Sequence, residues 1–287
     1  MTFSADGEHL LSGGLTQNVQ VWQVQDGQQV ATIEAENVFC LAVSKNGRWI
    51  AGGTLWGEVI VWDAETYELV WEHGKDYWII EAIDFSPDST KLVSGSSNYI
   101  ATIWDVASGK KIRTLQHEQS VFAAKFSSDG DRIVTGTSQS VQVWDSKDGH
   151  LLVDIPVMVT SSYNNGLLWF NNHIFVVSDN TIKQLDASTG STVYEWQVPN
   201  NDFNSCIAMP RHGKFIACST GTSCSVTFWD TSTHLRIGFI RHTDDICSIA
   251  ISPDNGCLAI GGENGTIMIT SSSCITVSIV SRCLIRV

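Results

Sequence analysis

Eight cysteines and eight histidines are the side chains of this chain best suited to bind a metal, form disulfides or act as nucleophiles. The cysteines lie at positions 40, 206, 218, 224, 247, 257, 274 and 283, without a Cys-x-x-Cys pair or a His-rich spacing. Most fall inside apolar runs such as Ile246-Cys247-Ser248-Ile249, where a free cysteine packs as a small hydrophobic side chain. We therefore expect reduced core thiols in an intracellular protein, with a zinc site or a disulfide framework as the less supported alternative.

Local motifs that carry enzymatic chemistry are also missing from the sequence. It contains no Gly-x-Ser-x-Gly nucleophile elbow, no glycine-rich phosphate loop and no His-Glu-x-x-His metal pair. The sequence therefore predicts no catalytic residue, no metal ligand and no cofactor.

A Trp-Asp pair instead recurs along the chain at an almost constant interval. It occurs at Trp62-Asp63, Trp104-Asp105, Trp144-Asp145 and Trp229-Asp230, and Trp22-Gln23 is a copy that lacks the acid. The gaps between the tryptophans are 40, 42 and 40 residues, followed by a double gap of 85. Halving that gap leads to Gln184-Leu185-Asp186, and one further step leads to Met268-Ile269-Thr270. A period of roughly 40–45 residues that carries Trp-Asp is typical of a propeller blade.

Each repeat is predicted to contain four short strands. An apolar run ends in a turn such as Phe126-Ser127-Ser128-Asp129-Gly130, whose residue types favour turn dihedrals. A second strand follows, the third ends in Trp-Asp, and a polar step opens the fourth. Short strands at regular spacing predict an all-β radial architecture.

These residues resemble the WD40-repeat family, and the resemblance covers the whole chain. It implies an all-β, seven-bladed WD40-type β-propeller of four-stranded antiparallel blades, with degenerate fifth and seventh repeats and an incomplete first repeat. We expect a single domain over 1–287, with repeats at roughly 1–34, 35–73, 74–115, 116–155, 156–198, 199–241 and 242–287.

The resemblance also implies a buried polar network of His, Ser or Thr, turn Asp and Trp in each repeat. His117, Thr135 and Trp144 could supply three members in the fourth repeat, but only Asp179 occupies the turn position in any repeat. We therefore expect a partial or absent network in most blades, with structural rather than catalytic histidines.

The first repeat begins only two residues before Phe3 and is short of its first strand. One hypothesis is that residues 283–287 fill this inner position, so that deleting 281–287 would lower the melting temperature. The alternative is that this segment is a frayed tail or that the chain is a fragment of a longer protein.

Composition limits the partners. The 17 basic and 30 acidic residues give a formal net charge of -13, which argues against direct binding of nucleic acid or of an anionic membrane. No apolar run is long enough to span a bilayer, and no secretory signal is visible. We expect an intracellular, cytoplasmic or nuclear protein.

Four aromatic residues fall at loop positions of the second and third repeats: Trp56, Tyr77, Trp78 and Tyr99. In a propeller these loops share one face, so the residues could form a patch that binds a protein or peptide partner. Alternatively, Trp78 begins the inner strand and the others only pack on adjacent loops. Four further tryptophans lie in strand patterns and are expected in the core: Trp49, Trp71, Trp169 and Trp196.

The resemblance and the absence of catalytic motifs together predict a non-catalytic scaffold or adaptor that binds other proteins. One alternative is a sensor or regulatory WD40 module of a larger signalling NTPase-type protein. A more remote alternative is a propeller enzyme, which would need acid, base or metal groups converging on the channel mouth.

Overall fold

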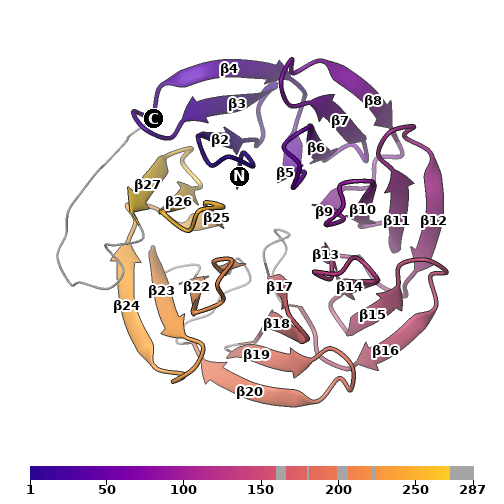
Figure 1. The fold of residues 1–287 in the computed structure, drawn as a ribbon, viewed down its shortest axis with the longest axis vertical. Helices are drawn as coiled ribbons and strands as arrows, with labels where there is room; N and C mark the ends of the chain where they lie inside the picture. The colour runs from indigo at the N-terminus through magenta and orange to yellow at the C-terminus, as the bar shows by residue number, and fades with distance from the viewer. Residues whose placement is uncertain (160–165, 180, 199–205, 221–223, 272–287) are drawn as a thin grey trace.

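The computed structural model describes residues 1–159, 166–179, 181–198, 206–220 and 224–271. Every regular element in these ranges is a β-strand, and the strands form seven sheets around a central axis (Figure 1). Six sheets have four antiparallel strands, and the seventh has three within the described residues. The chain is therefore the predicted all-β, seven-bladed propeller.

In each blade the strands run in sequence order from the axis to the rim (Figure 1). Blade one contains β1 (Thr2–Phe3), β2 (His9–Ser12), β3 (Asn18–Gln23) and β4 (Gln29–Glu34). Blade two contains β5 (Val38–Val43), β6 (Trp49–Thr54), β7 (Val59–Asp63) and β8 (Leu69–His73). Blade three contains β9 (Ile80–Phe85), β10 (Lys91–Ser96), β11 (Ile100–Asp105) and β12 (Lys111–Gln116). Blade four contains β13 (Ala123–Phe126), β14 (Arg132–Gly136), β15 (Val141–Asp145) and β16 (Leu151–Ile155).

The degenerate repeats fold as blades as well. Blade five contains β17 (Leu167–Phe170), β18 (His173–Ser178), β19 (Thr181–Asp186) and β20 (Thr192–Gln197). Blade six contains β21 (Ile207–Ala208), β22 (Phe215–Thr220), β23 (Ser225–Asp230) and β24 (Arg236–Arg241). Blade seven contains β25 (Ile246–Ile251), β26 (Cys257–Gly262) and β27 (Ile267–Ser271). The hypothesis that residues 283–287 complete blade one lies outside the described residues.

The hydrophobic core lies between the blades. The described residues form seven apolar clusters, each shared by two adjacent blades. The cluster that joins the last blade to the first packs Phe3, Leu10 and Trp22 against Ala259, Ile267 and Ile269. Because a blade is apolar on both faces, each sheet needs a neighbour on either side, and the ring supplies one.

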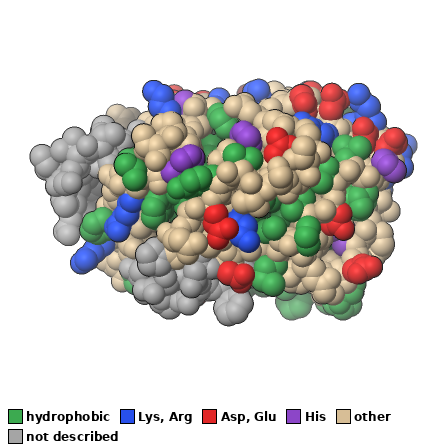
Figure 2. Space-filling model, turned by 90° about the horizontal axis from the view of Figure 1, so that it is seen from below, with side chains coloured by type: hydrophobic (Ala, Val, Ile, Leu, Met, Phe, Trp, Pro, Cys, Tyr) green, Lys and Arg blue, Asp and Glu red, His purple; other side chains and the backbone are tan. Residues whose placement is uncertain are grey.

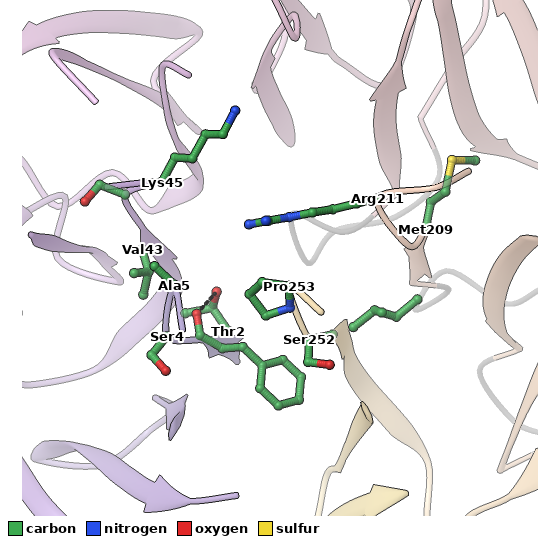
Figure 3. Close-up of a pocket in the computed structure, with 13 residues that line it drawn as sticks. Thr2, Ser4, Ala5, Val43, Lys45, Met209, Arg211, Ser252 and Pro253 are labelled. Atoms are coloured by element: carbon green, nitrogen blue, oxygen red, sulfur yellow. Dashed lines mark hydrogen bonds between the residues drawn. The ribbon is translucent and has the colours of Figure 1, made fainter. Parts of the chain in front are cut away.

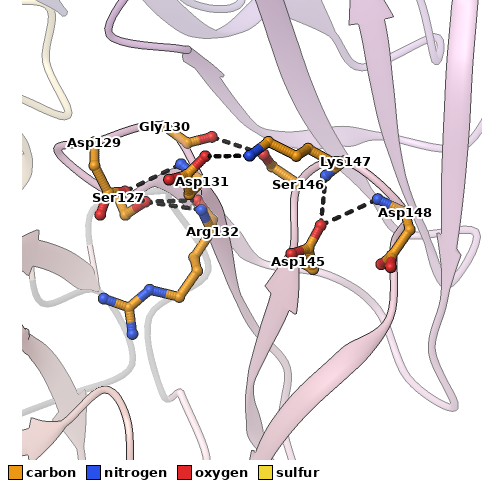
Figure 4. Close-up of polar contacts among 9 residues, drawn as sticks. All are labelled: Ser127, Asp129, Gly130, Asp131, Arg132, Asp145, Ser146, Lys147 and Asp148. Atoms are coloured by element: carbon orange, nitrogen blue, oxygen red, sulfur yellow. Dashed lines mark hydrogen bonds and ion pairs between the residues drawn. The ribbon is translucent and has the colours of Figure 1, made fainter.

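Two hydrogen-bonded turns hold the edge of a blade in place, one between its first two strands and one between its last two. Blade four shows both (Figure 4). In the turn between its first two strands, the hydroxyl of Ser127 donates to Asp129 and accepts from the backbone amide of Arg132. In the turn between its last two strands, Asp145 accepts the amides of Lys147 and Asp148 at 2.7 and 3.1 Å.

The two turns of blade four are also joined to each other. Ser146 donates its hydroxyl to the Gly130 carbonyl at 2.7 Å, and Lys147 pairs with Asp131 at 3.0 Å (Figure 4). The ion pair is exposed, so the buried serine hydroxyl contributes more to stability than the charges do.

Seen from the side, the ring is a thick disc with apolar side chains scattered among charged ones (Figure 2). Several outer strands expose alternate apolar residues, among them Leu152 on β16, Val193 on β20 and Phe239 on β24. Single exposed apolar residues are normal on a protein surface.

Of the four tryptophans expected in the core, only Trp196 is fully buried. Trp49, Trp71 and Trp169 are partly buried and pack on the edges of apolar clusters. Trp71 lies on the outermost strand of blade two, where its indole donates to the Val106 carbonyl of blade three at 2.7 Å. No further strand lies beyond β8, so the indole of Trp71 covers the cluster from outside.

Candidate functional site

The motif tryptophans all lie on third strands and pack toward the preceding blade. The side chains of Trp22, Trp62, Trp104 and Trp144 are buried, and that of Trp229 is partly buried. A hydroxyl on the neighbouring second strand accepts the indole proton in three blades. These bonds are Trp22 to Ser12 at 2.9 Å, Trp104 to Ser94 at 2.8 Å and Trp144 to Thr135 at 2.8 Å.

The same register explains why the other blades lack this bond. Pairing of the second and third strands places Gly52, Val176, Cys218 and Ile260 at the position of Ser12. At Gly52 a Cβ atom would lie 2.8 Å from the Trp62 ring, so the indole fills the space of the missing side chain. Trp229 instead donates to Thr227 on its own strand at 3.3 Å.

Among the described residues, a histidine joins the Trp–hydroxyl pair only in blade four, where His117 does so without a turn aspartate. Its Nε2 lies 2.8 Å from the Thr135 hydroxyl, and its Nδ1 lies 3.0 Å from the Leu115 carbonyl. Burial lowers the pKa of His117 to about 4, so the ring is neutral at physiological pH. Because both ring nitrogens are engaged with structural groups, His117 serves the blade and has no free nitrogen for chemistry.

The aspartates of the Trp-Asp pairs cap the turn that follows the third strand. Asp63, Asp105, Asp145 and Asp230 each accept backbone amides from residues two or three positions later. Hydrogen bonds lower the pKa of all four carboxyl groups. The largest contribution comes from the Ser108 hydroxyl at Asp105, from the Ser232 hydroxyl at Asp230, whose pKa falls to about 2, and from backbone amides at Asp63 and Asp145. The four aspartates are turn-forming residues.

Exposed aromatic side chains gather on the face that carries the loops between blades and between second and third strands. Trp56 follows β6, Tyr77 and Trp78 lie between β8 and β9, and Tyr99 follows β10. Their exposed fractions are 46%, 76%, 54% and 46%. We call these four residues the aromatic loop surface.

Direct contacts join part of this surface. The rings of Trp56 and Tyr77 meet edge to face with centroids 6.2 Å apart, and the Tyr77 amide donates to the Trp56 carbonyl at 3.1 Å. Trp78 precedes the inner strand β9, which begins at Ile80, and its carbonyl accepts the hydroxyl of Ser96 at 3.4 Å. The loops of blades two and three are thus bonded to one another.

Asp76 is the residue that sequence reasoning did not identify. Its carboxylate accepts the Trp78 amide at 3.3 Å and the side-chain amide of Asn98 at 3.4 Å, which joins the Tyr77 loop to the Tyr99 turn. A Cβ atom at Gly57 would collide with the same carboxylate, so glycine is required there. In the sequence, the only indication was an acidic residue next to two aromatic residues in a long loop. The direction in which its side chain points depends on how the neighbouring loops pack.

Lys75 fixes the other end of the loop. Its ammonium lies 3.4 Å from the Glu58 carboxylate and 3.8 Å from that of Glu72. The Glu58 side chain is largely buried and also accepts the Thr54 hydroxyl at 3.3 Å. The aromatic side chains are therefore carried on loops whose backbone is tied down by polar contacts.

Two tyrosines of the surface hold a left-handed backbone, with φ of 65° at Tyr77 and 70° at Tyr99. Tyr99 occupies the turn position that Gly57 and Gly265 hold in blades two and seven. A bulky residue with positive φ is strained, and such residues are often retained at functional sites. A glycine would form the Tyr99 turn with less strain but would provide no aromatic side chain on this surface.

The strongest candidates for proton chemistry lie on the inner strand β9. Burial raises the pKa of Glu81 to about 7 and raises that of Asp84, which the nearby Lys125 ammonium at 3.4 Å partly offsets. Asp84 also accepts the Phe126 amide at 2.9 Å, which ties blade three to blade four. Among the described residues, no group of three or more His, Cys, Asp or Glu side chains is arranged to hold a metal ion. In the same residues, no helix is long and apolar enough to cross a membrane.

Comparison with known proteins gives matches along most of the chain. It is 27% identical to protein tipD of Dictyostelium discoideum over 88% of its own length and 43% of that protein. It is 25% identical to the serine-threonine kinase receptor-associated protein of Gallus gallus over 62% of its length and 50% of the relative. The chain thus spans half or less of these two relatives. It is also 25% identical to a guanine nucleotide-binding protein subunit beta of Schizosaccharomyces pombe, over 94% of its length and 90% of the relative.

The family model of the WD domain, G-beta repeat, matches residues 27–63, 67–105, 109–145 and 233–271, which together make up more than half of the chain. Each matched segment starts at or just before the outer strand of one blade and ends with the third strand of the next. A sequence repeat therefore joins two neighbouring blades covalently. The Trp-Asp pairs, the seven blades and these four matches together show that the chain belongs to the WD40-repeat family.

Proposed function

We propose that this protein is a non-catalytic interaction scaffold that binds a protein or peptide partner through the aromatic loop surface. Propellers of the WD40 family generally bind other proteins. The observation that carries the proposal is the clustering of exposed Trp and Tyr side chains on three loops that are bonded together. Large aromatics held on a prepared backbone contribute most to protein interfaces, because they bury much area with little loss of conformational freedom.

Polar contacts that hold the loops in place also support the proposal. Asp76 and the Lys75–Glu58 pair hold the backbone that carries Tyr77 and Trp78, so little ordering is needed when a partner binds. The strained tyrosines at 77 and 99 favour the same conclusion, since turn formation alone would be served better by glycine.

The experiment is affinity purification from cells with mass spectrometry, using wild-type protein and the double variant Trp56→Ala/Tyr77→Ala as baits. Leu152→Ala is the matched control because Leu152 is also exposed, at 47%, but lies on the outer strand of blade four. We expect the double variant to lose specific partners that the wild type and the control retain. Equal recovery of the same partners by all three baits would show that the surface is not the binding site.

The alternative, a regulatory WD40 module of a larger signalling NTPase-type protein, uses the same ring and stays a prediction. A longer transcript that encodes an NTPase domain in frame with this chain would favour it. An intracellular location remains part of the proposal and is supported by the free thiols of the described cysteines.

A further inference from the structure

A cavity of about 210 Å³ opens at the axis on the face opposite the aromatic loop surface. It is formed by the turns between first and second strands of blades one, two, six and seven. Lys45 and Arg211 both line it and extend from opposite sides toward its middle (Figure 3). We call this opening the turn-face mouth.

The two cations occupy equivalent places in the repeat. Each is the second residue of the turn that opens with serine in most blades. The six residues aligned at this place are Ala5, Lys45, Pro87, Ser128, Arg211 and Pro253. No acidic residue stands among them. In a chain of net charge -13, the residues that line the cavity thus include two cations and no acid.

The rim that carries these residues is continuous. The Asn46 amide donates to the Ser89 hydroxyl at 3.2 Å, and the Arg211 amide donates to the Asn255 side chain at 2.7 Å. A Cβ atom at Gly47 would lie 3.3 Å from that of Ala5. Because the turns that carry Lys45 and Arg211 each contact the turn of the next blade, their backbone is held in place without a ligand.

The charges of the mouth are not neutralised by the ring. Within the described ranges, neither the Lys45 ammonium nor the Arg211 guanidinium takes part in an ion pair. The nearby acids Asp6 and Asp254 do not line the cavity, and each accepts a serine hydroxyl and a backbone amide within its own turn. An anion in the mouth would thus meet two cations first.

We propose that the turn-face mouth binds one oxyanion-bearing side chain, phosphoryl or carboxylate, of a partner's extended segment. The guanidinium can contact two oxygens side by side and the ammonium acts as a point charge, which suits a phosphoryl or carboxylate group. The volume is below the roughly 300–1,000 Å³ of typical small-molecule sites and fits a side chain. A peptide is favoured over an anionic membrane because the net negative charge of the whole chain opposes membrane approach.

This inference does not rest on the aromatic loop surface, which lies on the other face. If both hold, the ring carries two partner sites on opposite faces. Failure of either test leaves the other intact.

The test titrates the full ¹⁵N-labelled chain with a short glycine–serine peptide that carries one central phosphoserine, followed by nuclear magnetic resonance. A single oxyanion held by two charge-assisted contacts is expected to bind weakly, with a Kd of about 1 mM. The amide signals of Lys45 and Arg211 should shift most. The variant Lys45→Ala/Arg211→Ala should weaken the Kd at least tenfold.

Lys110→Ala is the control, because it removes a positive charge from an exposed turn on the same face but away from the axis. It should leave the Kd unchanged. Binding of the phosphoserine peptide alone would assign the site to phosphoryl groups, and equal binding of a glutamate peptide would assign it to oxyanions in general.

Three results would overturn the proposal. The first is a plain serine peptide that binds as well as the acidic ones. The second is an affinity that the double variant keeps. The third is binding only to phosphatidylserine vesicles, lost in the double variant, which would make the mouth a membrane contact.

Discussion

The single hydroxyl of Thr135 connects two buried aromatic side chains, the indole of Trp144 and the imidazole of His117. It accepts the Trp144 indole proton at 2.8 Å and lies 2.8 Å from His117 Nε2, and the residue itself is fully buried. Removing that hydroxyl without changing the shape of the side chain isolates the polar contribution from the packing contribution.

Thr135→Val should therefore lower the free energy of unfolding by about 2–4 kcal/mol, because it leaves both rings without their buried partner. Urea denaturation measures this difference. The control Thr114→Val lies on the exposed side of β12 and should change stability by less than about 0.5 kcal/mol. Equal effects of the two substitutions would contradict a structural role for the network.

Glu81 gives a pH dependence with a defined sign. Its folded pKa is raised by burial to about 7, and one carboxylate oxygen has no hydrogen-bond partner among the described residues. Between pH 4.5 and 7 the folded state binds the extra proton, so stability is full below that window and falls as pH rises through it.

Glu81→Gln, which stays neutral, should be more stable than wild type above pH 7 by up to about 3 kcal/mol, and the difference should shrink toward pH 4.5. Thermal melts across pH measure it. The exposed Glu68→Gln serves as control. Parallel stability profiles for wild type and Glu81→Gln would show that Glu81 ionises normally in the fold.

The turn that carries Tyr99 places a tyrosine in a left-handed backbone conformation that favours glycine. Gly57 and Gly265 hold the equivalent left-handed position in blades two and seven. A non-glycine residue there costs about 1–2 kcal/mol.

Tyr99→Gly should thus leave stability unchanged or raise it by up to about 1 kcal/mol, while it weakens partner binding. The two readouts are a denaturant midpoint and the amount of partner retained by affinity purification. Tyr67→Gly, which relieves a positive φ of 60° on the opposite face, should not affect binding. A destabilised Tyr99→Gly with unchanged binding would make Tyr99 a packing residue.

The elements show what the sequence could predict. The Trp-Asp period indicated seven blades even where Leu185 and Thr270 replace the tryptophan, because strand alternation survives in those repeats. It could not predict that Asp76 joins the Tyr77 loop to the Tyr99 turn, since a loop side chain takes its direction from tertiary neighbours. It also overestimated the burial of Trp49, Trp71 and Trp169, because a strand pattern does not tell the middle of an apolar cluster from its edge.

At the level of the whole ring, stability depends on the contact between the last and first blades. Phe3, Leu10 and Trp22 pack there against residues of β26 and β27. Each blade contacts only its neighbours, so this cluster is what closes the chain of sheets into a ring.

Leu10→Ala, at a fully buried position of that cluster, should lower the free energy of unfolding by about 2–5 kcal/mol. Because an opened ring exposes two sheet faces, blades one and seven should also lose hydrogen-exchange protection before the others. Ile133→Ala in blade four is the matched control, with a similar loss of stability but no selective exposure of the seam. Uniform loss of protection in Leu10→Ala would mean that the seam has no special role.

The central claim is that the aromatic loop surface binds the partner. It is tested most directly by hydrogen–deuterium exchange of the full chain with and without a partner recovered by affinity purification. We predict new protection in peptides that cover residues 54–57, 74–79 and 96–100, and none of this change in Trp56→Ala/Tyr77→Ala. Protection confined to other segments, with these three unchanged on partner binding, would contradict the account.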